Sequence, residues 1–224
     1  MNRKIVLSVG EFYHIYNRGV EKKQIFLDRY DYDRFMILLL LANRLESLDI
    51  RNFRRSKKNS GGGTSAGKEQ ETLVDIGAYC LMPNHFHILI HEKTEGGITK
   101  FIHKLTTAYT MYFNRKYERV GPLLQGTFKS EHADSDEYLK YLFSYIHLNP
   151  LKIFNKKWRE SYKSDPVSKK SFLDNYVYSS YLDYAGLNRE DEAILCTSSF
   201  PEYFDDPEDF KSNLFDWFDE PGLV

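Results

Sequence analysis

Residues 76–90 hold two apolar segments with a turn signal between them. The segments 76–82 and 86–90 flank the dipeptide Pro83-Asn84. This pattern predicts an antiparallel hairpin with a short connection. A hairpin with apolar strands needs a covering layer on at least one face, so the rest of the chain is constrained to supply it.

The second strand of this hairpin carries two histidines. Because side chains alternate between the faces of a strand, Phe86, Ile88 and Ile90 share one face, and His85 and His87 lie on the other. Two imidazoles in this arrangement can converge on one divalent cation. They can equally be ordinary surface residues of a sheet, so the motif needs support from elsewhere in the chain.

The remaining periodic segments complete a recognisable order. Residues 12–16 predict a strand that stops at Asn17-Arg18-Gly19, residues 28–46 and 98–112 predict amphipathic helices, and residues 128–133 predict a short strand. The order strand, helix, strand, strand, helix, strand is the βαββαβ pattern of a ferredoxin-like sandwich. We therefore expect an α+β fold with helices over one sheet face and both histidines on the open face.

Two regions lie outside this pattern. Residues 51–72 begin with a basic run and continue as Ser-Gly-Gly-Gly-Thr-Ser-Ala-Gly, which predicts a flexible insertion. Residues 187–224 contain eleven acidic and two basic residues, which leaves 29 basic and 21 acidic residues in 1–186. We expect a basic domain over 1–186 and an acidic C-terminal extension over 187–224, and a basic domain suits a phosphate-rich partner.

Composition excludes several classes of protein. The two cysteines, Cys80 and Cys196, cannot form a disulfide framework or a four-thiolate metal site, and the start lacks an apolar signal segment. The longest apolar run is too short to span a bilayer. We expect a cytoplasmic protein that is not inserted in a membrane.

A further helix is predicted after residue 134. The sequence Asp134-Ser-Asp-Glu137 predicts a capping box, and Pro150 predicts that the helix ends at Asn149. The apolar positions of this helix form one stripe, made of Leu139, Leu142, Phe143 and Ile146, and a second stripe contains Tyr138, Tyr141, Tyr145, Asn149 and Lys152. Since residues four apart are neighbours on a helix, Tyr145 presents its phenol beside the amide of Asn149.

These motifs together resemble a known family. The sequence Tyr145-Ile-His-Leu-Asn149-Pro150, the His85-Phe-His87 pair and the loop Gly121-Pro-Leu-Leu-Gln125-Gly126 are similar to the single-tyrosine HUH transposases of insertion sequences. The start Tyr13-His14-Ile15 with Asn17-Arg18-Gly19 and the motif Tyr178-Ser-Ser-Tyr181 resemble the REP-associated tyrosine transposase branch. The resemblance covers roughly residues 12–186 and departs at Leu124 and Thr127, where relatives often have Trp and Arg.

The resemblance implies a metal-dependent endonuclease and strand transferase for single-stranded DNA, acting on repeats that fold into hairpins. Tyr145 would be the nucleophile that forms a 5′-phosphotyrosine link, and His85, His87 and Asn149 would hold Mg²⁺ or Mn²⁺. We also expect contacts with DNA from a set of polar residues near the site in sequence, the phosphate-binding Arg115, Lys116 and Lys129 and the base-contacting Asn17, Arg18 and Gln125.

Alternative interpretations stay open at this point. The chain could be a non-catalytic module that binds single-stranded nucleic acid through aromatic side chains of the sheet. It could also be a metal hydrolase that uses His85, His87 and the carboxylate of Glu131 to activate water. His14 is expected to be hydrogen bonded beneath the site, and His91 to be solvated. The sequence leaves open a homodimer, in which the tyrosine helix serves a partner, and an acidic tail that shields the basic face.

Overall fold

The computed structural model describes residues 6–53, 71–158 and 165–214. Its centre is a four-stranded sheet in which every neighbouring pair is antiparallel, in the order β2-β3-β1-β4. The strands are β1 (Phe12–Arg18), β2 (Asp75–Met82), β3 (His85–His91) and β4 (Lys129–His132). This order and the intervening helices make the fold a ferredoxin-like α+β sandwich, which confirms the predicted fold class.

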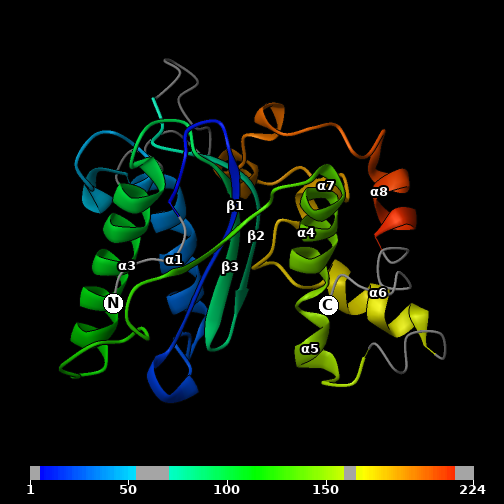
Figure 1. The fold of residues 1–224 in the computed structure, drawn as a ribbon. Coiled ribbons are helices and arrows are strands. Elements are labelled where there is room, and N and C mark those ends of the chain that lie inside the picture. Colours follow the sequence, from blue (N-terminus) through cyan, green and yellow to red (C-terminus); the bar gives the residue numbers. More distant parts are fainter. Residues whose placement is uncertain (1–5, 54–70, 159–164, 215–224) are drawn as a thin grey trace.

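The helices are distributed on both sides of the sheet (Figure 1). Two long helices, α1 (Arg29–Ala42) and α3 (Gly97–Lys116), lie against one face, and α4 (Asp136–Leu148) lies against the other. The shorter elements are η1 (Val20–Lys22), α5 (Leu151–Phe154), α6 (Pro166–Asp174), α7 (Tyr181–Tyr184), η3 (Glu190–Ile194), η4 (Thr197–Ser199) and α8 (Pro207–Asn213). Across the described ranges, no helix combines the length and the apolar composition needed to cross a bilayer.

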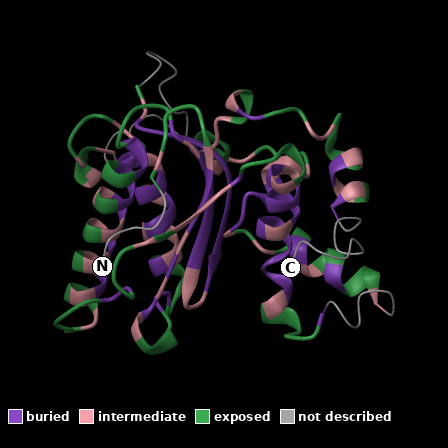
Figure 2. Ribbon diagram, viewed as in Figure 1, coloured by how far each residue is buried: buried purple, intermediate pink, exposed green. Residues whose placement is uncertain are grey.

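The main core lies between the sheet and the helices α1 and α3. Phe86, Ile88 and Ile90 of β3 all belong to it, together with Tyr13 and Ile15 of β1. Strands β1, β2 and β3 are accordingly buried along most of their length (Figure 2), whereas the residues of β4 are exposed or partly exposed. The predicted alternation of β3 is therefore confirmed, and its histidines lie on the face toward α4.

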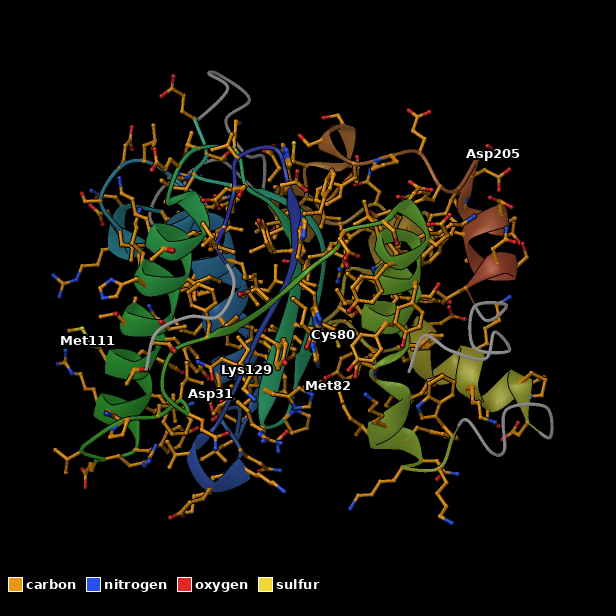
Figure 3. The ribbon with its side chains drawn as sticks, in the orientation of Figure 1. Asp31, Cys80, Met82, Met111, Lys129 and Asp205 are labelled. Carbon is orange, nitrogen blue, oxygen red and sulfur yellow. The ribbon has the colours of Figure 1, made fainter. Side chains whose placement is uncertain are left out.

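That second face is not open, contrary to our expectation. The apolar stripe of α4 packs on it, and the resulting second core includes Cys80 and Met82 of β2 (Figure 3) and Leu142 and Ile146 of α4. A stripe of leucine, phenylalanine and isoleucine must be buried somewhere, and this sheet face is the apolar surface available to it. The histidine face is thus enclosed by the same helix that carries Tyr145.

Helix α4 ends at its C-cap Asn149, as predicted, but its N-cap and the backbone conformation at Asn149 differ from the prediction. The N-cap is Ser135, whose side chain accepts a hydrogen bond from the backbone N–H of Tyr138, so the cap lies one residue later than expected. At the other end, Asn149 keeps helical dihedrals (φ −54°, ψ −37°) and so does Pro150 (φ −55°, ψ −27°). Pro150 therefore separates α4 from α5 without turning the chain into an extended conformation, and α5 follows directly.

The C-terminal segment packs on the domain as far as it is described. Phe210 and Leu214 are buried against α7 and the end of α4. Phe200 contacts Gly77 so closely that a Cβ at position 77 would lie 2.6 Å from its ring. The last ten residues, 215–224, lie outside the described residues, as does most of the predicted insertion 51–72.

Candidate active site

A half-open cavity of about 250 Å³ lies where the ends of β1 and β3 meet α4. His85, His87 and Tyr145, three of the four predicted catalytic and metal-binding residues, line it. The cavity is also lined by a set of polar residues from the strand ends and loops, namely Tyr16, Asn17, Arg18, Asn84, Gln125 and Lys129. Residues far apart in the sequence therefore meet in one place with the residue types that metal and phosphate chemistry requires.

The two histidines each use one ring nitrogen within the protein. Nδ1 of His85 lies 2.6 Å from Oδ1 of Asn84, and Nδ1 of His87 lies 2.8 Å from Nε2 of His14. Nε2 of His87 is buried and has no hydrogen-bond partner among the residues that the structure describes. A histidine whose Nδ1 is held by a neighbour while Nε2 has none has the arrangement of a metal ligand.

Burial lowers the pKa of His85 to about 4, assisted by the positive charges of Lys152 and Arg18. Burial also holds the pKa of His87 well below its ordinary value, with smaller effects from neighbouring His14 and His85. Both imidazoles are therefore neutral at pH 7, which is the form that binds a cation.

Tyr145 reaches the histidines within the same chain. Its ring lies edge-on to that of His87 at a centroid distance of 5.5 Å, and to that of His14 at 5.7 Å. The other tyrosines of this helix have different surroundings, since the phenol of Tyr138 donates to Glu131 and Tyr141 is buried. Of these three tyrosines, Tyr145 is the one that lines the cavity together with the two histidines.

Asn149 is close to Tyr145 but does not line the cavity. Its Nδ2 donates to the backbone oxygen of Tyr145 at 2.9 Å, and its Oδ1 accepts from Nζ of Lys152 at 2.7 Å. The oxygen that was expected to bind the metal therefore already accepts a hydrogen bond from an ammonium group. Among the described residues no group of three or more His, Cys, Asp or Glu side chains could hold a metal ion, so a metal here would depend on the mixed set of two imidazoles and this amide.

Four of the six predicted DNA contacts line the cavity: Asn17, Arg18, Gln125 and Lys129. The loop that carries Gln125 is joined to the end of β1, since the N–H of Gln125 donates to the oxygen of Arg18 at 2.8 Å. Asn17 is buried, and its Nδ2 donates to the oxygen of Gly126, so it shapes the loop.

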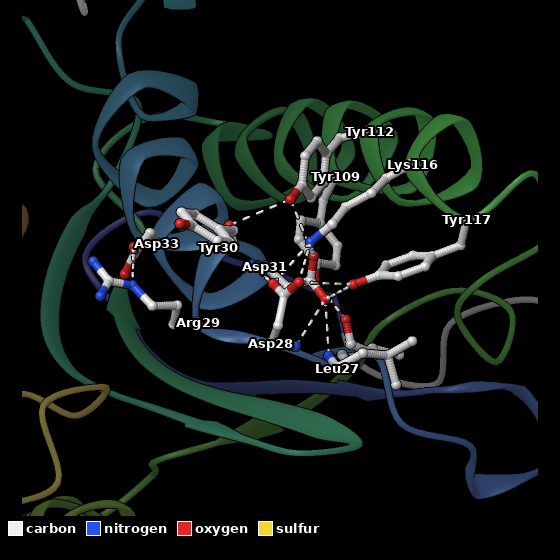
Figure 4. Close-up of polar contacts among 11 residues, drawn as sticks. Leu27, Asp28, Arg29, Tyr30, Asp31, Asp33, Tyr109, Tyr112, Lys116 and Tyr117 are labelled. Carbon is white, nitrogen blue, oxygen red and sulfur yellow. Dashed lines mark hydrogen bonds and ion pairs between the residues drawn. The ribbon is translucent and has the colours of Figure 1, made fainter.

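Arg115 and Lys116 lie at the end of α3, which covers the opposite face of the sheet. Nζ of Lys116 forms ion pairs with Asp28 at 2.8 Å and with the buried Asp31 at 2.7 Å (Figure 4). A buried carboxylate requires such a partner, so Lys116 has a structural role in this cluster and we do not retain it among the expected DNA contacts.

Sequence reasoning missed Tyr16 and had no position for Glu131. Tyr16 lies on the same face of β1 as His14, so alternation along this strand would have identified it. Its phenol donates to Glu131 at 2.8 Å, and burial together with this carboxylate raises the pKa of Tyr16 to about 12. The hydrogen bond from His14, which outweighs the effect of burial, lowers the pKa of Glu131 to about 2. Glu131 is thus an ionised carboxylate, and His14 lies between it and His87.

Comparison with known proteins gives a family for the centre of the chain. Residues 64–149 match the family model described as transposase, IS200-like. A solved structure of a REP-associated tyrosine transposase bound to a REP hairpin is similar over 85% of this chain and 89% of its own, with 14% identity and a TM-score of 0.46. The comparison with curated proteins gives no match. The range that matches this family model begins before the histidine hairpin and ends at Asn149, so it includes both histidines and Tyr145.

Proposed function

We propose that the protein is a metal-dependent endonuclease and strand transferase for single-stranded DNA, with Tyr145 as its nucleophile. The observation that carries this proposal is the contact of the Tyr145 ring with His87 in a cavity that Arg18 and Lys129 also line. The buried Nε2 of His87 has no partner within the described part of the chain. A phenol, a pair of neutral imidazoles and two cationic side chains are the groups that transfer of a phosphodiester to tyrosine requires.

In the proposed reaction the phenolic oxygen of Tyr145 attacks the scissile phosphorus. A bond forms between this oxygen and phosphorus, the bond from phosphorus to the 3′ oxygen breaks, and the leaving strand takes up a proton to become a free 3′-OH. The product is a 5′-phosphotyrosine link, which keeps the phosphodiester energy and allows the reverse attack by another 3′-OH. A free phenol with a pKa of about 10 is only about 0.1% ionised at pH 7, so the site must stabilise developing charge.

His85, His87 and Asn149 would hold the Mg²⁺ or Mn²⁺ that this chemistry needs. The two imidazoles fit this role, since both Nδ1 atoms are held within the protein. Asn149 fits it once Lys152 releases Oδ1. When bound, a divalent cation supplies polarisation of the scissile phosphate and neutralisation of its charge.

The proposed substrate is single-stranded or hairpin DNA, as in the REP-associated branch that the sequence resembles. Lys129 would contact a phosphate, and Arg18 and Gln125 would contact bases. Asn17, which was also expected to contact a base, shapes the loop between them. The nucleophile and both histidines belong to one chain, so the proposed site needs no residue from a partner, and a homodimer stays a prediction. The proposed location is the cytoplasm.

The two alternative functions are less well supported. A sheet that reads single strands through exposed aromatics needs an open face, and here helices cover both faces. A hydrolase that uses Glu131 to activate water needs this carboxylate beside His87, but His14 lies between them. The carboxylate is also held by the phenols of Tyr16 and Tyr138.

Covalent capture tests the proposal. The full chain is incubated with end-labelled hairpin DNA carrying single-stranded flanks, with and without Mn²⁺, and is then denatured. We expect a DNA adduct that depends on the metal and disappears in Tyr145→Phe. The matched control is Tyr141→Phe, which removes a phenol one turn earlier on α4 and should retain the adduct. Cleavage that persists in Tyr145→Phe would support the hydrolase, and binding without any adduct across many hairpins would support the binding module.

A further inference from the structure

A second histidine lies directly beneath His87. His14 of β1 and His87 of β3 are on the same face of the sheet, with their rings stacked at a centroid distance of 5.0 Å and an interplanar angle of 20°. Nε2 of His14 lies 2.8 Å from Nδ1 of His87. Only 3% of His14 and 5% of His87 is exposed, so water does not compete for this hydrogen bond.

A carboxylate continues this chain of contacts. Glu131 of β4 is paired directly with His14 in the sheet, and its Oε2 lies 3.5 Å from Nδ1 of His14. The phenol of Tyr16 donates to Oε1 at 2.8 Å, and the phenol of Tyr138 donates to Oε2 at 3.2 Å. Glu131 is therefore fixed in position from both β1 and α4.

The direction of the hydrogen bonds follows from the carboxylate. Within the described residues Nδ1 of His14 makes no close hydrogen bond, and the polar group that faces it is the carboxylate of Glu131 at 3.5 Å. Because a carboxylate accepts and does not donate, this contact favours the tautomer of His14 with its proton on Nδ1. Nε2 of the neutral His14 then accepts, and Nδ1 of His87 must donate to it. The lone pair of His87 is consequently on Nε2, the buried nitrogen that lacks a partner.

We propose that Glu131 and His14 are positioning residues that fix the tautomer and the ring orientation of His87 for binding a divalent cation. The inference rests on the proposed function and deepens it, because it assigns this role to two residues outside the expected set of ligands. His85 has a simpler support, the side-chain oxygen of the adjacent Asn84. Partners of this kind raise metal affinity by holding the ligand in its binding form.

The test measures Mn²⁺ affinity by electron paramagnetic resonance on the full chain without DNA. His14→Phe keeps an aromatic ring but removes the acceptor for Nδ1 of His87, and we expect Mn²⁺ to bind about 10- to 100-fold more weakly. Glu131→Leu should weaken binding similarly, while Glu131→Gln, whose amide oxygen can still accept from His14, should recover most of the loss. The matched control is His132→Phe, since His132 pairs with Glu11 at 2.8 Å on the same sheet and should leave affinity unchanged.

A second readout needs neither metal nor DNA. Nitrogen-15 spectra of the imidazoles should show His87 with its proton on Nδ1 in the natural sequence and a mixture of tautomers in His14→Phe. A folded His14→Phe protein with unchanged Mn²⁺ affinity and an unchanged His87 tautomer overturns the proposal. If His14→Phe does not fold, equal affinities of Glu131→Leu and Glu131→Gln overturn it instead. If the DNA adduct forms at Tyr145 but these substitutions leave Mn²⁺ affinity unchanged, only the positioning role is refuted. If the substitutions weaken Mn²⁺ binding but no DNA adduct forms, only the transferase activity is refuted.

Discussion

The ammonium nitrogen of Lys152 lies 2.7 Å from Oδ1 of Asn149 and 4.9 Å from the ring centroid of Tyr145. One cationic side chain therefore contacts both the proposed nucleophile and the proposed amide ligand. A metal bound to Asn149 through Oδ1 would have to compete with this hydrogen bond and with the charge of Lys152.

Replacing Lys152 should strengthen metal binding in the absence of DNA. In Lys152→Met the amide oxygen is released and a nearby positive charge is removed, so we expect Mn²⁺ to bind about fivefold more tightly, or about 1 kcal/mol. Isothermal titration calorimetry measures this change. Lys156→Met, a charge removal in an exposed segment that does not line the cavity, is the control. Weaker binding in Lys152→Met would contradict the competition.

Lys129 should contribute to DNA affinity and Arg115 should not. Lys129 lines the cavity, whereas Arg115 lies on α3 at the opposite face of the sheet. We expect Lys129→Met to bind single-stranded DNA severalfold more weakly and to reduce the slope of log affinity against log salt by about 0.7, the value for one lost phosphate contact. Fluorescence anisotropy over a salt series measures both. An equal loss in Arg115→Met would extend the DNA-binding surface to the other face.

The buried Asp31 should make stability depend on pH. Burial alone would raise the pKa of Asp31, but hydrogen bonds from Lys116, the N–H of Leu27 and Tyr117 outweigh it and hold the pKa below its ordinary value. Because the folded pKa is below the unfolded one, the stabilisation is present above pH 4 and is lost as pH falls through the folded pKa.

We therefore expect Asp31→Asn to lower the free energy of unfolding by about 3 kcal/mol at pH 7, with the difference from the natural sequence shrinking near pH 3. Urea unfolding at the two pH values measures this. Asp33→Asn is the control, since Asp33 forms a partly exposed pair with Arg29 at 3.9 Å and should change stability by less than about 1 kcal/mol at either pH. A loss in Asp31→Asn that is the same at both pH values would mean that the charge is not its source.

Phe210 should be important for stability. It is 1% exposed and its ring contacts those of His147 and Tyr184, each at a centroid distance of 5.3 Å. We expect Phe210→Ala to lower the free energy of unfolding by about 3–5 kcal/mol, measured by urea unfolding. Phe154→Ala, at a residue that is 42% exposed, should cost about 1 kcal/mol. A small effect of Phe210→Ala would mean that the C-terminal segment is only loosely attached.

The hairpin and the two faces of its second strand could be predicted because they depend on local patterns. Alternation in β3 separated Phe86, Ile88 and Ile90 from the two histidines, and the turn at Pro83-Asn84 fixed the hairpin. The order of elements then allowed few topologies. The expectation that His14 is hydrogen bonded beneath the site followed from the same reasoning and is confirmed by its contact with His87.

The covering of the histidine face could not be predicted in this way. The apolar stripe of α4 shows that one side of the helix is buried, but its sequence does not say which of the two sheet faces it covers. The contact between His14 and Glu131 likewise depends on the pairing of β1 with β4, strands more than a hundred residues apart. Whether Oδ1 of Asn149 is available to a metal depends on its hydrogen bond from Lys152. The long side chain of Lys152 can reach several partners, so this contact could not be predicted.

The helical dihedrals at Asn149 and Pro150 have a consequence for any movement of this part of the chain. No extended hinge residue separates Tyr145 from Asn149 and Lys152, so a displacement of the segment would carry phenol, amide and ammonium together. The spacing of these three groups would then be preserved while their distance from the imidazoles changed. In the proposed strand exchange, the tyrosine could move relative to the two histidines while its contacts with the amide and the ammonium group stayed the same.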